Sequence, residues 1–210
     1  MNREKFCDIY VARISAGAAN YEPLYPESRE NEVSGIKNER VRREKYFVWK
    51  LFEHALKNSL GIEIKDLKIE KNKNGKWVAD GVNFSLSHGG EALAVVISSS
   101  SVGIDIEPLS AVKNSNAAKR MLTEREFSEF KGLPETQGKE YIIKKWTAKE
   151  AIFKASCEPI FHPQLIETSE HDVSCWECVI EGERYVFSLF NEEICEPDVF
   201  SDFCVCRCPI

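Results

Sequence analysis

Hydrophobic and polar residues follow one another along this chain with two different periods, which predict helices in some stretches and strands in others. From about residue 38 to residue 59, apolar side chains recur every three or four positions, as on one face of an amphipathic helix. Gly61 follows directly and is expected to end this helix. Residues 138–156 show the same spacing and predict a second helix, whereas residues 15–38, rich in Ser, Gly, Asn and Pro, are expected to form a loop.

Strand-like patterns lie between and after the two helices. Asn83–Ser87 and Ala92–Ser98 are predicted to be strands separated by a glycine-containing break, and Val102–Glu107 alternates with a period of two. Thr123 and Glu126 form a capping-box signature, which predicts the start of a short helix. Further strands are expected at Val173–Ile180, Arg184–Leu189 and Asp202–Cys208.

A weak internal repeat relates the two halves of the chain. The pattern Trp-x3-Glu-x3-Lys begins at Trp49 and again at Trp146, and Phe-Ser-Leu begins at Phe84 and again at Phe187. Identities this short also arise by chance, but their common order suggests two helix-then-strand units. We therefore expect an α+β, pseudo-duplicated fold with any functional site at the interface of two similar halves, residues 1–103 and 104–210.

The composition is that of an ordinary globular protein. The chain has 210 residues, of which 43% are hydrophobic and 30% charged, which excludes disordered and fibrous classes. Its longest apolar run, Ala92–Ile97, is far shorter than the roughly 20 residues of a membrane-spanning helix, and its first residues lack the apolar core of a secretion signal. We expect a cytoplasmic protein with reduced cysteines and with neither a membrane nor a nucleic-acid partner.

Several cysteines invite a metal interpretation, which their spacing does not favour. Cys175 and Cys178 form one C-x-x-C pair, and Cys204, Cys206 and Cys208 alternate along a predicted strand. A zinc site would need a second such pair or suitably spaced histidines, and neither is present in the sequence. We expect these thiols to be buried as small apolar side chains.

Charge is distributed unevenly along the chain. The net charge is -6, but the residues from Glu158 onward carry twelve Asp and Glu against two Arg, so residues 1–157 carry an excess of positive charge. That excess is concentrated in residues 37–50, 65–76 and 139–154. It indicates either an anionic partner or solvated helix faces.

Two neighbouring carboxylates are the first candidates for chemistry. Asp105 and Glu107 are two positions apart on a predicted strand, so they point to the same face. Like charges this close repel unless a cation or strong donors offset them, and Mg²⁺ prefers such oxygen ligands. The alternative is an edge strand that carries two ordinary surface acids.

Glu150 and Lys154 form a second candidate set on the predicted helix at residues 138–156. Four residues apart, they are neighbours on the helix surface and would ordinarily form an exposed ion pair. Large apolar neighbours such as Trp146 and Phe153 indicate that part of this helix is buried. There, a Lys could neutralise a leaving diphosphate and a Glu could bind a metal or accept a proton.

Two further segments offer groups that could contact a phosphate. Residues 87–90, Ser-His-Gly-Gly, follow a predicted strand and provide a hydroxyl, an imidazole and two glycines that allow close backbone approach. They could equally form an ordinary turn. The basic run Arg40–Lys45 could receive phosphates or could be a solvated helix start.

The order and spacing of these motifs resemble those of the 4'-phosphopantetheinyl transferase superfamily. Its pattern (V/I)-G-(I/V)-D-x-E, followed by W-(S/T)-x-K-E-(A/S)-x-x-K, is met here at Val102, Gly103, Ile104, Asp105 and Glu107, then at Trp146, Thr147, Lys149, Glu150, Ala151 and Lys154. Gly75 and Lys76 resemble the family's G-K-P, with Trp77 in place of the proline. The likeness extends over residues 40–156 and is greatest to the larger, monomeric type that activates synthetases.

The resemblance implies transfer of phosphopantetheine from coenzyme A to a serine of an apo acyl or peptidyl carrier protein, with release of adenosine 3',5'-bisphosphate. It implies Mg²⁺ on Asp105, Glu107 and Glu150, with Glu150 also as the base for the carrier serine and Lys154 on the diphosphate. Contacts to coenzyme A are expected from Ser87, His88 and Lys76, and from Lys45 for the 3'-phosphate, with Arg42 or Arg43 as alternatives. Glu126 resembles a further acidic residue near the metal.

Two other functions use the same residues. A coenzyme A-binding regulatory protein would keep the binding site without the reaction, although it would have no need for Asp105, Glu107, Glu150 and Lys154 together. A metal-dependent phosphohydrolase would use the same carboxylates with water as the nucleophile. Carrier proteins are typically acidic, which suits the positive excess of residues 1–157.

Overall fold

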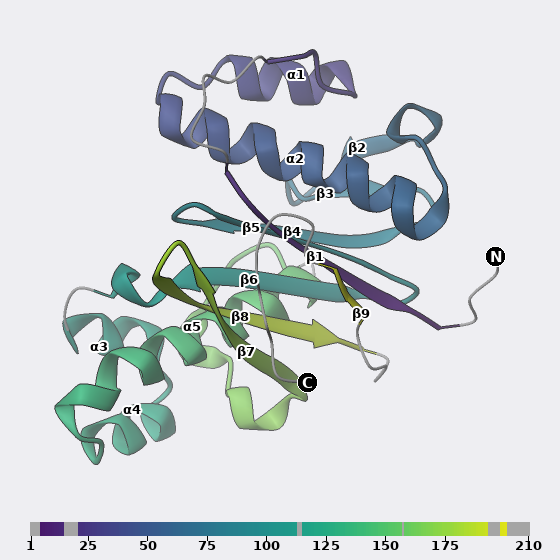
Figure 1. The fold of residues 1–210 in the computed structure, drawn as a ribbon. Coiled ribbons are helices and arrows are strands. Elements are labelled where there is room, and N and C mark those ends of the chain that lie inside the picture. Colours follow the sequence, from purple (N-terminus) through teal and green to yellow (C-terminus); the bar gives the residue numbers. More distant parts are fainter. Residues whose placement is uncertain (1–4, 15–20, 113–114, 157, 193–197, 201–210) are drawn as a thin grey trace.

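The fold was analysed in a computed structural model that describes residues 5–14, 21–112, 115–156, 158–192 and 198–200 (Figure 1). Its strands are β1 (Cys7–Arg13), β2 (Ile69–Lys71), β3 (Trp77–Ala79), β4 (Asn83–Gly89), β5 (Ala92–Ser98), β6 (Val102–Pro108), β7 (Val173–Ile180), β8 (Glu183–Asn191) and β9 (Asp198–Phe200). Its α-helices are α1 (Glu27–Ser34), α2 (Glu39–Leu60), α3 (Ala118–Met121), α4 (Glu124–Lys131) and α5 (Glu135–Ser156). Short 3-10 turns are η1 (Ile64–Asp66), η2 (Leu109–Ala111), η3 (Ser115–Ala117), η4 (Pro163–Leu165) and η5 (Thr168–Glu170).

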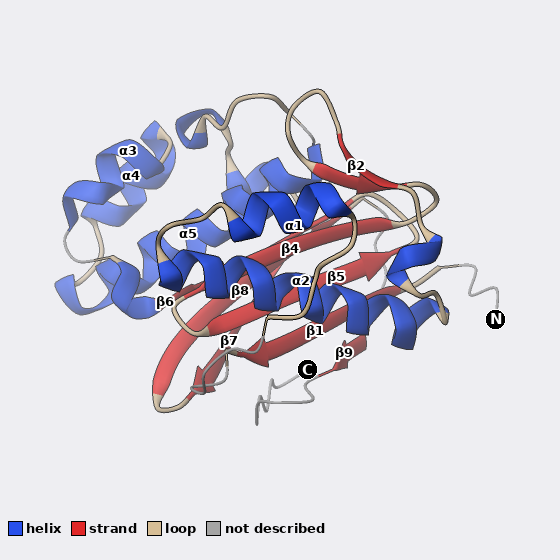
Figure 2. Ribbon diagram, turned by 90° about the horizontal axis from the view of Figure 1, so that it is seen from above, coloured by secondary structure: helices blue, strands red, loops and turns tan. Residues whose placement is uncertain are grey.

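Two sheets form the centre of the molecule, and a long helix covers the outer face of each (Figures 1 and 2). The first sheet has the order β4-β5-β1-β9 and the second β6-β8-β7, while β2 and β3 form a separate hairpin. All pairings within the two sheets are antiparallel except that of β1 with β9, which is parallel. Helix α2 packs on the first sheet and α5 on the second, so the layers run helix, sheet, sheet, helix.

Helix α2 forms where the helical spacing predicts it. The Asn38 side chain accepts a hydrogen bond from the Val41 backbone at its start, and Gly61 adopts a left-handed conformation (φ 69°) at its end. Its apolar face buries Trp49 and Phe52 completely against the first sheet. The predicted helix at residues 138–156 is also confirmed, within α5, and so is the capping box of Thr123 and Glu126 at the start of α4.

The expectation of a loop over residues 15–38 was wrong in part, because residues 27–34 form α1. This helix has little apolar patterning of its own, and its stability comes from tertiary contacts. The Arg29 guanidinium lies 4.6 Å from the centre of the Trp49 ring and donates to the Lys45 carbonyl at 2.7 Å. Strand β1 was not predicted either, since both of its faces are buried and its sequence shows no alternation of apolar and polar residues.

The core between the two sheets is apolar. From the first sheet, Ile9 and Val11 of β1 face Ile104 of β6 and Phe187 of β8, and all four are almost completely buried. The opposite face of the first sheet packs against α2. The candidate site residues predicted on β4 and β6 lie outside this apolar layer, where β6 runs beside β4.

Strand β6 meets β4 through side chains rather than through a backbone ladder. The Ile104 and Ile106 amides donate to the hydroxyls of Ser85 and Ser87, both at 3.2 Å. The predicted boundary between the two halves, at residues 103 and 104, falls inside β6. In addition, β9 of the second predicted half pairs with β1 of the first. The internal duplication stays a prediction.

Two remaining expectations concern the cysteines and membranes. Cys178 is buried, as predicted, but Cys175 is exposed because it lies on the opposite face of β7, so that expectation was wrong. Cys204, Cys206 and Cys208, with the strand predicted at Asp202–Cys208, lie outside the described residues. Among the described helices, none is both long enough and apolar enough to cross a membrane.

Replacing Gly103 with alanine tests the close approach of β6 to α5. A Cβ at this position would lie 1.9 Å from the Ala151 carbonyl oxygen and 2.9 Å from the Ala155 amide nitrogen, both backbone atoms that cannot turn away. We expect Gly103→Ala to lower the free energy of unfolding by about 3 kcal/mol, the upper end of the cost of overpacking. Chemical denaturation measures this.

Gly132→Ala is the matched control, because its Cβ would meet only the Glu129 carbonyl oxygen, at 3.4 Å. Its stability should stay within about 0.5 kcal/mol of wild type. Equal stability of the two variants would show that β6 and α5 do not pack as described.

Candidate active site

Three polar side chains from three different elements meet beside β6. Lys154 of α5 places its Nζ 2.7 Å from Asp105 Oδ1 of β6 and 3.1 Å from Ser87 Oγ of β4. Ser87 Oγ also donates to Asp105 Oδ1 at 2.7 Å, and Lys154 Nζ donates to the Ile104 carbonyl at 3.1 Å. Lys154 therefore pairs with Asp105 across the elements rather than forming a surface pair with Glu150 on its own helix.

A glycine on β4 allows β4 and β6 to approach closely enough for these side chains to meet. A Cβ on Gly89 would lie 2.4 Å from the Ile106 carbonyl oxygen, so only glycine permits β4 to approach β6 so closely here. The period-two pattern of β6 buries Ile104 and Ile106 in the inter-sheet core. Asp105 and Glu107 consequently share the opposite face, as the spacing predicted, and Asp105 is buried rather than on a solvated edge.

Glu107 and Glu150 are half-buried carboxylates to which the described residues offer no hydrogen bond or ion pair. Burial, reinforced by the charge of Asp105, raises the pKa of Glu107 to about 7. Burial also raises the pKa of Glu150, with Asp105 acting in the same direction and Lys154 opposing it. These carboxylates therefore repel one another without a sufficient counter-charge.

The donor set suits a hard divalent cation. Asp105 Oδ2 is buried and has no hydrogen-bond partner, although Oδ1 of the same group has two. An orphaned carboxylate oxygen beside two partnerless carboxylates is the arrangement that a bound Mg²⁺ would relieve. Within the described residues, however, no three such side chains are gathered closely enough to form a ready-made metal site.

His88 lies on β4 next to Ser87 and faces α2. Its Nδ1 is 3.6 Å from Glu44 Oε2, a buried carboxylate that also accepts from Arg40 Nε at 2.9 Å. Burial lowers the pKa of His88, although Glu44 opposes this. Glu44 was not identified from the sequence, because its partner His88 lies on a different element.

Two hollows lie along β4, one on each side of Ser87 and His88. One, of about 330 Å³, is mainly apolar and is bordered by Lys76, Trp77, Phe84, Phe153 and Lys154. The Lys76 ammonium group donates to the Lys154 carbonyl, so it lies at this hollow. The other hollow, of about 490 Å³, begins at Gly90 and is lined by charged residues of α2, of the β4–β5 turn and of the start of β8: Glu39, Arg40, Arg43, Glu44, Glu91 and Glu183.

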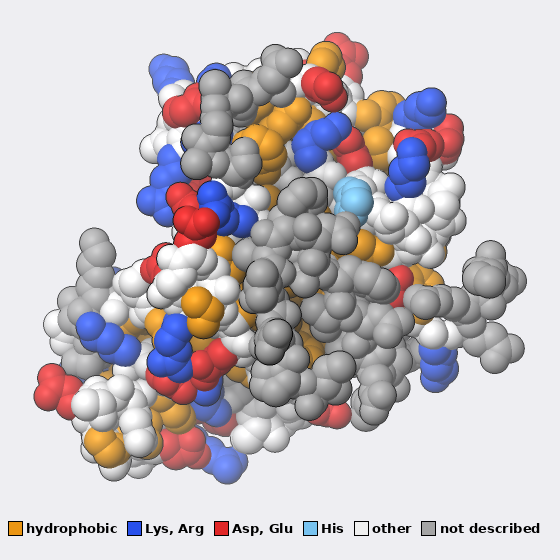
Figure 3. Space-filling view, viewed as in Figure 1, with side chains coloured by type: hydrophobic (Ala, Val, Ile, Leu, Met, Phe, Trp, Pro, Cys, Tyr) orange, Lys and Arg blue, Asp and Glu red, His pale blue; other side chains and the backbone are white. Residues whose placement is uncertain are grey.

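The basic run of α2 is largely engaged in ion pairs. Charged side chains of both signs are mixed over α1 and α2 (Figure 3). Arg42 pairs with Glu39 and lies over the Tyr21 ring at 4.9 Å, and Lys45 Nζ is 3.4 Å from Glu32. Of the residues predicted for the 3'-phosphate, it is thus the alternative Arg43 that lines the charged hollow.

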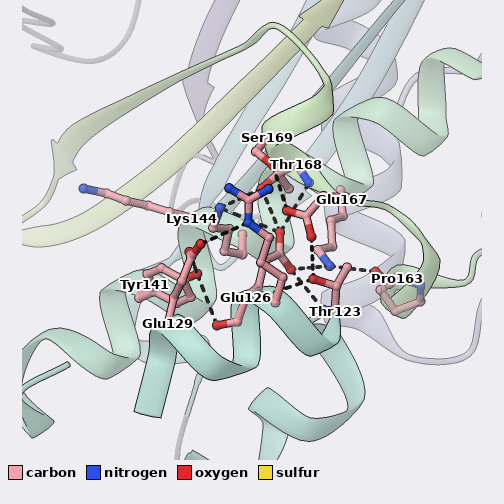
Figure 4. Close-up of polar contacts among 12 residues, drawn as sticks. Thr123, Glu126, Glu129, Tyr141, Lys144, Pro163, Glu167, Thr168 and Ser169 are labelled. Atoms are coloured by element: carbon pink, nitrogen blue, oxygen red, sulfur yellow. Dashed lines mark hydrogen bonds and ion pairs between the residues drawn. The ribbon is translucent and has the colours of Figure 1, made fainter. Parts of the chain in front are cut away.

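Glu126 belongs to a separate, buried network that joins α4, α5 and η5 (Figure 4). Its Oε2 is 2.6 Å from Lys149 Nζ, and its Oε1 accepts from Thr168 Oγ1 at 2.7 Å. Burial alone would raise the pKa of Glu126, but Lys149, Thr168 and the Thr123 amide together lower it. Glu126 is therefore held by Lys149 and two threonines rather than being aimed at Asp105, in contrast to the role implied by the family resemblance.

Comparison with known proteins points to one family. The profile of the 4'-phosphopantetheinyl transferase superfamily matches residues 101–204. The 4'-phosphopantetheinyl transferase HetI of Nostoc sp. is 32% identical over 116 residues, which cover 51% of this chain and 49% of that protein. The 4'-phosphopantetheinyl transferase gsp of Aneurinibacillus migulanus is 29% identical over 153 residues, covering 71% of this chain and 60% of that protein.

A shorter relative matches as well. The holo-[acyl-carrier-protein] synthase of Streptococcus sanguinis is 45% identical over 58 residues, which cover 25% of this chain and 48% of that protein. In these matches the chain spans only about half to three fifths of the length of its relatives.

Glu107→Gln tests the repulsion among the three carboxylates in metal-free protein. The pKa of Glu107, raised to about 7 in the folded state, exceeds its unfolded value of about 4.3. As the pH rises between these values the unfolded chain loses the proton first, so wild type loses stability that Glu107→Gln keeps. We expect the variant to match wild type near pH 4 and to exceed it above pH 7 by about 1 kcal/mol, allowing for solvent screening.

Thermal unfolding in a chelator, measured across this pH range, checks the expectation. The exposed Glu170→Gln serves as the control for loss of a carboxylate elsewhere and should show no such growing difference. A constant difference between Glu107→Gln and wild type at all pH values would contradict the raised pKa of Glu107.

Proposed function

The chain belongs to the 4'-phosphopantetheinyl transferase superfamily, and on that premise we propose that it transfers 4'-phosphopantetheine from coenzyme A to a serine of an apo acyl or peptidyl carrier protein. The co-product is adenosine 3',5'-bisphosphate. The observation that carries the proposal is the buried, partnerless Asp105 Oδ2 beside two partnerless carboxylates and an anchored lysine. That set fits a metal-bound diphosphate.

Coenzyme A fits the order of features along β4. It has a charged nucleotide at one end, a long neutral pantetheine arm at the other, and a diphosphate between them. We place the diphosphate at Ser87, His88 and Lys154, with the nucleotide in the charged hollow and the arm toward the apolar hollow. In this arrangement Arg43 meets the 3'-phosphate, and Lys76 lies near the start of the arm.

Each residue then has a distinct task. A Mg²⁺ ion held by Asp105, Glu107 and Glu150 would neutralise the diphosphate charge. Lys154, fixed by Asp105 and by the Ile104 carbonyl, holds its positive charge at the diphosphate as the bond to the leaving group breaks. The Glu150 carboxylate accepts the proton of the carrier serine as its oxygen attacks the β-phosphorus.

The other two functions are less well supported. A regulatory protein that only binds coenzyme A would gain nothing from the partnerless Glu150, whose ionised form is disfavoured by burial. A phosphohydrolase would use the same site on water. Incubation with coenzyme A, Mg²⁺ and an apo carrier separates the three. Modified carrier indicates a transferase, bisphosphate without modified carrier indicates a hydrolase, and binding of coenzyme A without either product indicates a regulator. We expect the carrier to gain the mass of phosphopantetheine.

Asp105→Asn tests the metal role in this assay. The substitution keeps the size of the side chain but removes the charge from both oxygens, including the orphaned Oδ2. We expect kcat to fall by at least about 100-fold, since a catalytic metal contributes several kcal/mol. Mass spectrometry of the carrier measures the rate, and chelator should abolish wild-type activity.

The exposed Glu170→Gln again provides the control and should retain wild-type turnover. Circular dichroism establishes that Asp105→Asn is folded. Near-normal turnover in folded Asp105→Asn, or full activity in excess chelator, would refute a metal at Asp105.

Glu150→Gln and Lys154→Ala should differ in kind, although both lie on one face of α5. Glu150→Gln cannot accept a proton, so kcat should fall by roughly 10²–10⁴ while coenzyme A binding at high Mg²⁺ changes little. Lys154→Ala removes a charge that contacts coenzyme A before and during the reaction, so KM for coenzyme A should rise and kcat should fall. Initial rates against coenzyme A concentration distinguish them.

A loss of coenzyme A binding in Glu150→Gln without a loss of kcat would contradict the role of Glu150 as a base. If Glu150→Gln weakened coenzyme A binding as much as Lys154→Ala and left kcat near normal, Glu150 would position the substrate and the base would be solvent water.

A further inference from the structure

The charged hollow that begins at Gly90 holds more negative than positive charge. It is lined by four carboxylates and two guanidinium groups: Glu39, Glu44, Glu91 and Glu183 against Arg40 and Arg43. In the arrangement proposed above, this hollow receives the nucleotide of coenzyme A, whose 3'-phosphate carries further negative charge. Carboxylates that surround a phosphate repel it, so the net charge of this hollow opposes the 3'-phosphate.

Glu44 of α2 lies between this hollow and the diphosphate position at His88. One of its oxygens, Oε1, accepts from Arg40 Nε at 2.9 Å, and the other, Oε2, is 3.6 Å from His88 Nδ1. Glu44 is only 8% exposed, so water screens its charge little, and its contacts with Arg40 and His88 keep it in place. A phosphate that enters the hollow beside Arg43 therefore also meets the Glu44 carboxylate.

The positive charge expected at the 3'-phosphate is largely paired with glutamates. Arg42 pairs with Glu39, and Lys45 Nζ is 3.4 Å from Glu32 Oε1. Of the three residues expected there, Arg43 lines the hollow, and it is next to Glu44 in the sequence. The attraction that Arg43 exerts on a 3'-phosphate is thus offset by the repulsion from Glu44.

The diphosphate does not meet the same repulsion. Lys154 Nζ lies at that position, 3.1 Å from Ser87 Oγ and beside the carboxylates that we assign to Mg²⁺. The reaction also takes place there, because the β-phosphorus is attacked, whereas no bond of the 3'-phosphate forms or breaks. A coenzyme without the 3'-phosphate therefore keeps every reacting group and adds less negative charge to the hollow.

We propose that this chain also uses 3'-dephospho-coenzyme A as a substrate, and that Glu44 is the residue that sets this tolerance. The inference rests on the proposed transferase function and adds a second coenzyme to it. The oxygen of the carrier serine bonds to the β-phosphorus as the bond from that phosphorus to the bridging oxygen breaks, and the serine proton passes to Glu150. The leaving group is then adenosine 5'-monophosphate in place of the 3',5'-bisphosphate.

The ratio of kcat/KM for coenzyme A to kcat/KM for 3'-dephospho-coenzyme A measures the tolerance. Both values come from the same enzyme and the same apo carrier, so effects on folding or on the carrier cancel. A phosphate held by charged hydrogen bonds without opposing charge would favour coenzyme A by more than about tenfold. For wild type we expect a ratio below about ten, measured by mass spectrometry of the carrier with adenosine 5'-monophosphate as the co-product.

Glu44→Gln and Arg43→Gln should change this ratio in opposite directions. Glu44→Gln keeps the size of the side chain but removes the repulsion, so we expect the ratio to rise by at least about fivefold, or about 1 kcal/mol. Arg43→Gln removes the attraction and leaves the carboxylates, so the ratio should fall below that of wild type.

Glu53→Gln is the matched control. Glu53 also lies on α2 and is paired with a cation of the same helix, Lys50, but it does not line the charged hollow. Its substitution should leave the ratio at the wild-type value. Thermal midpoints establish that all three variants are folded.

The outcomes separate this inference from the proposed function. If wild type modifies no carrier with either coenzyme, the transferase function itself fails. If wild type uses coenzyme A but the ratio is about ten or more, only the tolerance is wrong. If the ratio is lower but Glu44→Gln leaves it unchanged, the assignment of the tolerance to Glu44 is wrong.

Discussion

The close approach of β6 to β4 is the constraint on which the rest of the site depends. The two strands belong to different sheets and share no backbone ladder, so the amides on this edge of β6 need other acceptors. Ser85 and Ser87 supply them, and the ammonium group of Lys154 donates to the Ile104 carbonyl. The same two atoms, Ser87 Oγ and Lys154 Nζ, therefore hydrogen-bond both to the backbone of β6 and to the Asp105 carboxylate. Structure and candidate chemistry are inseparable at this point of the molecule.

This sharing explains why the site holds unbalanced charge. One lysine faces three carboxylates, and the pKa values of Glu107 and Glu150 are raised because burial adds to their mutual repulsion. A protein shaped only for stability would have paired these groups, as the Glu126–Lys149 network does on the other side of α5. Helix α5 thus contributes Lys149 to a paired network that stabilises the fold, and Glu150 and Lys154 to a charged cluster suited to binding a ligand.

Periodic patterns within a segment predicted most helices and strands correctly. Elements that depend on contacts with distant parts of the chain could not be predicted from the sequence. Helix α2 and strands β5 and β7 were found closely because their periodicity and end signals lie within each segment. Helix α1 was missed because its stability depends on Arg29 packing against Trp49.

Asp105 and Lys154 were identified from their own motifs. Their pairing with each other could not be predicted, nor could the roles of Glu44 and Lys149, because each depends on a partner from another element.

The parallel pairing of β9 with β1 has a consequence for folding during synthesis on the ribosome. Among the described elements β1 is the first in the sequence, yet its neighbour on one side is β9, which is the last. Until β9 emerges the nascent chain carries β1 with one unpaired edge, the kind of edge that recruits other chains. Correct folding of the first sheet is thus complete only when synthesis has passed β9.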